Sequence, residues 1–264
     1  MSKAGESMER LLEVMRTLRA PEGCPWDIKQ THESLKSDLI EEAYEVIDAI
    51  ESGEPSELEE ELGDLLLQVV FHSQISDEAG EFAFDRVADG ITDKLIRRHP
   101  HVFGEVNVAD ADEVLQNWDA IKKTEKQGEG EAPKSIVAGI PRHLPALQKA
   151  HQVQKRAARA GFDWDHIDDV FAKLHEEIDE VKDAIQREHE ADIRDELGDL
   201  LFSVVNVSRY LGHNPEELLN QNIKKFIARF QYVEAQVHAS GKAFKEFSLT
   251  ELDLFWDQAK ANNL

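Results

Sequence analysis

The sequence predicts an all-α protein that consists of two similar helical domains in tandem. Apolar residues recur at helical spacing along most of the chain, strand signals are sparse, and one long motif occurs twice. Two copies are too few for a solenoid, so we interpret them as a duplicated helical domain. We expect a first domain over residues 1–123, a linker over 124–137 and a second domain over 138–264.

Helices are expected where apolar residues lie three and four positions apart. In the first half this pattern covers residues 8–18, 35–50 and 58–74. A turn over 52–55 separates the last two, and Ser56 is a suitable cap for the helix that follows it.

The middle of the chain loses this pattern. Residues 124–135 are polar and contain glycines and a proline, which is typical of a linker. Helical signal then resumes over 145–161. His99-Pro100-His101 fits a loop or a helix end better than a metal site, since the proline interrupts a helix.

The duplication is visible as four matched blocks in the same order. Residues 41–50 match 176–185 and residues 61–66 match 196–201, each 135 positions apart. Trp26-Asp27 matches Trp164-Asp165, and Trp118-Asp119 matches Trp256-Asp257, each 138 positions apart.

The charge balance excludes several classes of partner. The chain has 54 acidic and 30 basic side chains, a formal net charge of −24. Such a surface repels nucleic acid and anionic membranes, so we expect neither as a partner. The single cysteine, Cys24, and the polar start of the chain predict a cytoplasmic location.

Each copy of the motif carries five acids at helical spacing. Glu41, Glu42 and Glu45 can share one helix face, and Glu61 and Asp64 can share a face of the next helix. A short turn makes the two helices antiparallel, which brings the acids together. The matching acids of the second copy are Glu176, Glu177, Glu180, Glu196 and Asp199.

Gathered carboxylates need cations, because like charges repel and unpaired buried charges are costly. Carboxylate oxygens alone favour Mg²⁺, Mn²⁺ or Ca²⁺ over zinc. Mg²⁺ commonly bridges phosphates and activates a water for phosphoanhydride hydrolysis. The sequence has neither a P-loop nor the Glu-x-x-His spacing of di-iron bundles.

The alternative interpretation is a solvated acidic helix face. The duplication favours a functional site, because the acids repeat while neighbouring residues differ, such as Tyr44 and Asp179. Gly63 and Gly198 lie inside predicted helices, where a glycine indicates a packing reason or the close approach of another group. A non-catalytic module that binds Mg²⁺–nucleotide or a protein partner remains the second functional hypothesis.

The acid motif resembles that of the MazG family of nucleoside triphosphate pyrophosphohydrolases, over essentially the whole chain. The resemblance implies a helical bundle, a homodimer, and hydrolysis of NTP or dNTP to monophosphate plus pyrophosphate. It further implies that four acids ligate Mg²⁺, for which Mn²⁺ can substitute: Glu177, Glu180, Glu196 and Asp199. Glu176 would lie near the metal or the attacking water. The less certain second set is Glu42, Glu45, Glu61 and Asp64.

The two copies differ at basic positions, and the second copy is the expected catalytic one. Lys173 aligns with Asp38, and Asn222 aligns with Ile91 when the lysines at 225 and 94 are paired. The residues expected to bind the nucleotide are Lys173, Asn222, Lys225, Arg229 and Trp256. Surface charge remains the alternative for Lys225 and Arg229, and core packing for Trp256. We expect the first copy to be weak or structural.

Overall fold

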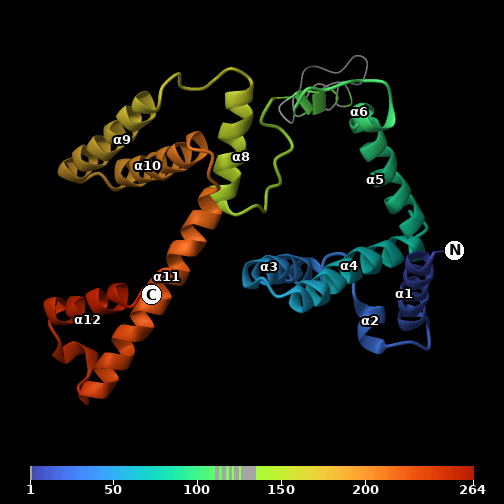
Figure 1. Ribbon diagram of the computed structural model, residues 1–264, viewed down its shortest axis with the longest axis horizontal. Coiled ribbons are helices and arrows are strands. Elements are labelled where there is room, and N and C mark those ends of the chain that lie inside the picture. Colours follow the sequence, from blue (N-terminus) through green and yellow to red (C-terminus); the bar gives the residue numbers. More distant parts are fainter. Residues whose placement is uncertain (1, 111–112, 115–116, 119–120, 122–124, 126–134) are drawn as a thin grey trace. The chain divides into compact units, whose positions relative to one another are not determined.

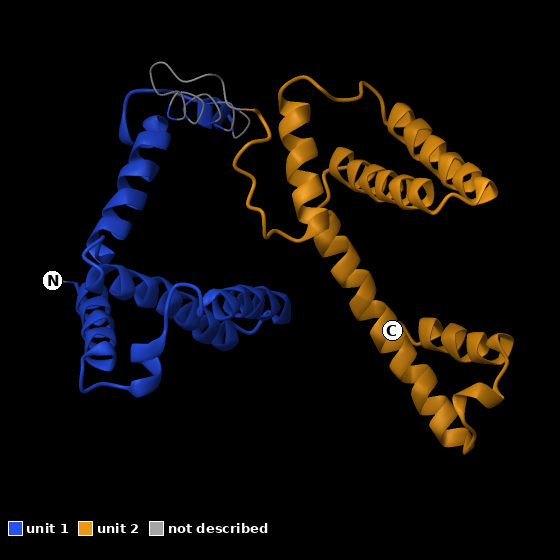
Figure 2. Ribbon diagram, turned by 180° about the vertical axis from the view of Figure 1, so that it is seen from behind, with its two compact units in different colours: residues 1–131 blue, residues 132–264 orange. Residues whose placement is uncertain are grey.

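The computed structural model describes the chain except residues 1, 111–112, 115–116, 119–120, 122–124 and 126–134. Every regular element in the described part is a helix (Figure 1), which confirms the predicted all-α class. The chain divides into two compact units, Met1–Glu131 and Ala132–Leu264 (Figure 2). The predicted linker lies largely outside the described residues, so its boundaries stay a prediction.

The first unit is organised around a helical hairpin. Helices α3 and α4 pack against each other, α1 packs on α4, and α5 continues from the end of α4 (Figure 1). The bounds are α1 (Lys3–Arg19), α2 (Pro25–Lys29), α3 (Lys36–Ser52), α4 (Pro55–Glu78), α5 (Phe84–Arg98) and α6 (Pro100–Phe103). The helices expected over 8–18, 35–50 and 58–74 are confirmed as parts of α1, α3 and α4.

Two details at helix ends can be compared with the sequence. The cap predicted at Ser56 is wrong, because α4 begins one residue earlier at Pro55, with Glu54 as its N-cap. The proline ring pre-sets the helical φ angle and lacks the N–H that would be unpaired there. The helix end expected at His99 is confirmed, since His99 ends α5 and Pro100 begins α6.

The second unit contains a matching hairpin. Helices α9 and α10 pack against each other, α8 packs on α10, and α12 folds back on the long helix α11 (Figure 1). The bounds are α8 (Ala146–Arg159), α9 (Ile167–Arg187), α10 (Glu190–Tyr210), α11 (Pro215–Ser240), a 3₁₀ turn (Phe244–Glu246) and α12 (Leu249–Ala261). The helical segment expected over 145–161 is therefore confirmed.

The two hairpins turn with different residues. Gly53 follows α3 in the left-handed conformation, at φ 74°, which glycine adopts without strain. Glu188 follows α9 in the same region, at φ 52° and ψ 31°. A side chain with a Cβ atom is strained there.

Few side chains are fully buried. The core of the first unit is formed by Met15, Leu35, Val70 and Phe71, with partly buried residues of α1, α4 and α5 around them. Many large apolar side chains of the hairpins stay exposed, such as Leu201, of which 62% is accessible. None of the described helices combines the length and the apolarity that crossing a bilayer requires.

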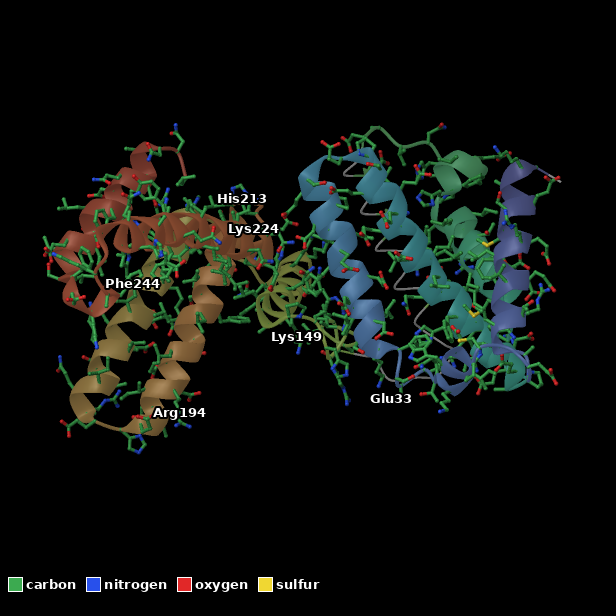
Figure 3. All side chains as sticks on the ribbon, turned by 90° about the horizontal axis from the view of Figure 1, so that it is seen from below. Glu33, Lys149, Arg194, His213, Lys224 and Phe244 are labelled. Carbon is green, nitrogen blue, oxygen red and sulfur yellow. The ribbon has the colours of Figure 1, made fainter. Side chains whose placement is uncertain are left out.

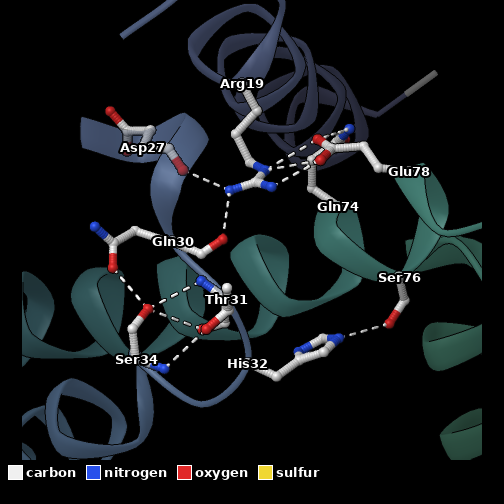
Figure 4. A network of polar contacts seen from close by, with 9 residues as sticks. All are labelled: Arg19, Asp27, Gln30, Thr31, His32, Ser34, Gln74, Ser76 and Glu78. Carbon is white, nitrogen blue, oxygen red and sulfur yellow. Dashed lines mark hydrogen bonds and ion pairs between the residues drawn. The ribbon is translucent and has the colours of Figure 1, made fainter. Parts of the chain in front are cut away.

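A buried arginine holds the loop that enters the first hairpin (Figure 4). The Arg19 side chain is 6% exposed, and its Nη2 lies 2.7 Å from Oε2 of Glu78 on α4. The same guanidinium donates hydrogen bonds to the backbone carbonyls of Asp27 and Gln30. Arg19 thereby fixes α2 and the loop after it against α4. Helix α3 begins at the end of this loop.

Candidate active site with two acid clusters

The first acid cluster lies between the two helices of the first hairpin. Glu42 is on α3, and Glu61 and Asp64 are one turn apart on α4. One carboxylate oxygen from each of the three lies within 4.8 Å of the others. Because α3 and α4 are antiparallel neighbours, acids that are about twenty positions apart in sequence face one another.

The second cluster repeats this arrangement between α9 and α10. Glu177 on α9 joins Glu196 and Asp199 on α10, again with three carboxylate oxygens within 4.8 Å of one another. Glu177 is buried, with 4% of its surface accessible, whereas Asp199 is exposed. Oε2 of Glu177 is buried and has no hydrogen-bond partner among the described residues.

The other predicted acids flank these groups of three. Glu180 lies beside Glu177 and Glu196, whose negative charges act on it. Glu45 has the same relation to Glu42 and Glu61 in the first unit. The structure thus places both outside the closest three carboxylates but within the range of their field.

Burial and mutual repulsion affect how these acids ionise. Burial, followed by the charges of Asp64 and Glu45, raises the pKa of Glu42, and similar causes raise the pKa of Glu61. Burial is also the main cause that raises the pKa of Glu180. Raised values are expected where carboxylates crowd together without a cation.

Lys173 distinguishes the second cluster from the first. Its Nζ lies 2.8 Å from Oε1 of Glu177 and 2.8 Å from Oε1 of Glu176. Hydrogen bonds to these two carboxylates raise the pKa of Lys173. In the first unit the corresponding residue is Asp38, which accepts a hydrogen bond from Ser37.

The structure adds one residue that the sequence did not indicate. Gln68 lies one turn after Asp64 on α4, is 5% exposed, and forms a hydrogen bond that lowers the pKa of Glu42. Its Oε1 is buried, and no described residue forms a hydrogen bond to it. The second copy has Ser203 at this position. A polar residue at core spacing was the available signal.

The remaining predicted nucleotide-binding residues lie on α11 and α12 of the second unit. Asn222 and Lys225 are exposed on α11, which packs mainly against α12 and α8, while α9 packs against α10. Arg229 donates a hydrogen bond from Nε to the backbone oxygen of Leu264 and lies over the ring of Trp256. The described part of the chain thus carries these groups on α11 and α12, whereas the acids lie on α9 and α10.

Aromatic side chains lie around Trp256 of α12. Its ring centroid is 5.0 Å from that of Phe226, and Phe226 stacks on Phe230. Phe244, labelled in Figure 3, also stacks on Phe230, with ring centroids 5.7 Å apart. Trp256 is therefore part of an aromatic cluster, and its role in base stacking stays a prediction.

The two helix-interior glycines of the hairpins face open space among the residues that the structure describes. A Cβ atom built at Gly63 or Gly198 meets nothing within 4 Å. The described residues therefore supply no packing reason for these glycines, and the close approach of another group stays a prediction. Both glycines lie beside exposed leucines, Leu62 and Leu197.

The donor set fits a hard divalent cation. Three converging carboxylates, one of them buried with an unpaired oxygen at Glu177, present oxygen ligands only. Oxygen donors in this number suit Mg²⁺, whose other positions are usually taken by water or substrate phosphates. The geometry is therefore compatible with phosphate chemistry that uses a metal.

Comparison with known proteins agrees with this geometry. A family model described as "MazG nucleotide pyrophosphohydrolase domain" matches residues 30–103 and 167–233, which contain the two clusters. A nucleoside triphosphate pyrophosphohydrolase/pyrophosphatase of Thermotoga maritima is 43% identical over 263 residues, covering 100% of this chain and 99% of that protein. A nucleoside triphosphate pyrophosphohydrolase of Escherichia coli K12 is 43% identical over 260 residues, covering 97% and 98%. One from Mycobacterium tuberculosis is 41% identical over 162 residues, covering 61% and 47%.

Proposed function

The chain belongs to the MazG nucleotide pyrophosphohydrolase family, and from this premise we propose that it hydrolyses nucleoside triphosphates. Cleavage between the α and β phosphates converts an NTP or dNTP and one water into a monophosphate and pyrophosphate. The observation that carries the proposal is the pair of three-carboxylate clusters on the two segments that match the family.

We propose Mg²⁺ as the cation, with Mn²⁺ able to substitute. Glu177, Glu196 and Asp199 would hold it, with Glu180 as a further ligand from the same helix as Glu177. When bound, Mg²⁺ offsets the charge of the phosphates and favours ionisation of the attacking water. The unpaired oxygen of buried Glu177 supports this assignment, because a ligand there would satisfy it.

The side chains around the cluster bind and orient the triphosphate. Lys173 can donate from Nζ to phosphate oxygens, since it lies at the edge of the cluster and is about one-third exposed at 36%. Glu176, paired with Lys173, stays close to the acids and to the attacking water. Asn222, Lys225, Arg229 and Trp256 remain our proposed contacts to the rest of the nucleotide, ATP included.

We propose that the second copy is the working site. Lys173 supports this, because Asp38 at the matching place in the first copy would repel a triphosphate. The first copy keeps Glu42, Glu45, Glu61 and Asp64, which we assign to metal binding with weak or no turnover.

We also propose a homodimer, because most soluble oligomers are closed and symmetric and the two-fold dimer is the commonest of them. The hairpins expose apolar residues at helical spacing, for example Leu62, Leu66 and Val69 on α4. Contiguous exposed apolar surface commonly marks an interface. A second copy could also approach closely at Gly63 and Gly198, and it could bring α11 to the hairpins. A cytoplasmic location, where nucleoside triphosphates are available, completes the proposal.

Product analysis tests the function. The protein is incubated with each NTP and Mg²⁺, and the products are separated by ion exchange. Monophosphate and pyrophosphate in equal amounts are expected, and chelation of the metal should stop the reaction until Mg²⁺ or Mn²⁺ is restored. Release of diphosphate and orthophosphate, or no turnover, would contradict the proposal.

A further inference from the structure

We propose that the two acid clusters take up a divalent cation in different ways. The first cluster, Glu42 with Glu61 and Asp64, binds the cation on its own and retains it. The second cluster, Glu177 with Glu196 and Asp199, binds it strongly only together with a triphosphate. This inference rests on the proposed function, because it takes both clusters as cation sites.

The second cluster already holds a positive charge. The Lys173 ammonium lies 2.8 Å from Glu177, the buried member of the cluster, and 2.8 Å from Glu176. An incoming cation must therefore displace this ammonium or sit beside a like charge, and both lower its affinity. The lysine thus occupies part of the site until another anion draws it away.

A triphosphate is an anion of the required kind. Its oxygens can accept hydrogen bonds from Nζ of Lys173, which frees Glu177 to face the cation. The nucleotide then increases the affinity for the cation, and by thermodynamic linkage the cation increases the affinity for the nucleotide equally. The second cluster should therefore take up metal and nucleotide as one unit.

The first cluster lacks this competitor. Asp38 stands one turn before Glu42 where the second copy has Lys173, and it adds negative charge instead of positive charge. In the part of the chain that the structure describes, no lysine or arginine pairs with Glu42, Glu61 or Asp64. A cation therefore meets only acids here, and these repel one another until it binds.

Gln68 supports retention of the cation at the first cluster. Its amide lies beside Glu42, and its Oε1 is buried with no hydrogen-bond partner in the described part of the chain. An unsatisfied buried carbonyl is costly, and coordination of a hard cation is one way to satisfy it. Ser203, its counterpart, has a shorter side chain and no such orphan oxygen.

Mn²⁺ binding to the full-length protein tests the inference, with free Mn²⁺ followed by electron paramagnetic resonance. Asp199→Asn leaves the first cluster as the intact site, and Asp64→Asn leaves the second. Both positions are exposed, and circular dichroism checks that each variant folds. The nucleotide is a triphosphate with a methylene bridge between its α and β phosphorus atoms, which resists cleavage.

We expect the Asp199→Asn protein to bind Mn²⁺ without nucleotide and to change little when the analogue is added. The Asp64→Asn protein should bind Mn²⁺ weakly, and the analogue should tighten binding on the order of tenfold or more. Equal affinities without nucleotide, or equal effects of the analogue on both, would overturn the inference.

Exchange of the key side chains locates the cause. In the Asp64→Asn background, Lys173→Met should strengthen Mn²⁺ binding without nucleotide, whereas Lys182→Met, at an exposed lysine of the same helix, should not. In the Asp199→Asn background, Asp38→Lys and Gln68→Leu should each weaken it. Unchanged binding in Lys173→Met would also overturn the inference. Pyrophosphate release by the unmodified enzyme is measured separately, so failure of the proposed function is recognised independently.

Discussion

Replacement of Arg19 by methionine should loosen the loop that enters the first hairpin. Methionine keeps much of the side-chain volume but removes the guanidinium that pairs with Glu78. The Arg19 side chain is 6% exposed. It also removes the donors to the carbonyls of Asp27 and Gln30. The expected change is a lower free energy of opening for residues 24–35.

The contacts set the size of the effect. Arg19 donates to Glu78 at 2.9 Å from Nε and 2.7 Å from Nη2, and to the carbonyl of Gln30 at 3.2 Å. Loss of one partner of a buried ion pair typically costs about 3–5 kcal/mol. The Glu78 side chain is 37% exposed, so water can partly solvate it, and we expect the lower end, ~3 kcal/mol.

Hydrogen–deuterium exchange measures this opening directly. The amides of Cys24, Ile28 and Leu35 lie in this segment and donate hydrogen bonds to the backbone carbonyls of Leu18, Cys24 and Thr31, respectively. Since about 1.4 kcal/mol is a factor of ten, their exchange should accelerate roughly a hundredfold. Arg16→Met is the matched control, because Arg16 is 45% exposed on the same helix and should contribute less than ~1 kcal/mol. Equal acceleration in both variants would refute the argument from burial.

Three further predictions concern protons, catalysis and assembly. Hydrogen bonds from Arg19 lower the pKa of Glu78, so their stabilisation is complete above its ordinary value of 4.5 and is lost as the pH falls through the lowered value. The destabilisation by Arg19→Met, followed by urea unfolding, should therefore shrink in acid, and a constant difference would argue against the ion pair. Glu180→Gln should reduce pyrophosphate release about 10²-fold or more, as loss of an electrostatic contact in an active site does, while Glu45→Gln retains most of it. The reverse ranking would assign catalysis to the first copy. Leu201→Glu, which charges an exposed apolar position, should shift the protein towards monomer in light scattering, whereas Arg194→Glu, at an exposed site near the hairpin turn (Figure 3), leaves the mass unchanged.

The local sequence pattern was sufficient to predict the helices and the acids that lie close together. Spacings of three and four residues place Glu61 and Asp64 on one face, and a short turn places them opposite Glu42. Lys173, four positions before Glu177, could likewise be read as a neighbour of the acids. Such neighbours follow from helix geometry and from the antiparallel direction of the hairpin, and both can be predicted from local sequence.

Contacts between distant segments could not be predicted in the same way. The burial of Arg19 depends on how α1, α2 and α4 pack, and nothing in its own segment distinguishes it from exposed Arg16. The orphan oxygen of Gln68 depends on its depth between two helices. The open space beside Gly63 among the described residues could not be predicted either, because a helix-interior glycine is equally consistent with tight packing.

The turn of the second hairpin also affects how the duplicated halves can diverge. Glu188 adopts a left-handed backbone that Gly53 adopts freely in the first half. For a residue with a Cβ atom this conformation costs roughly 1–2 kcal/mol. The half that we assign to turnover is thus slightly destabilised at Glu188, a residue that is not one of the proposed metal ligands. Glycine at this position offers a route to a more heat-resistant enzyme that leaves every acid unchanged.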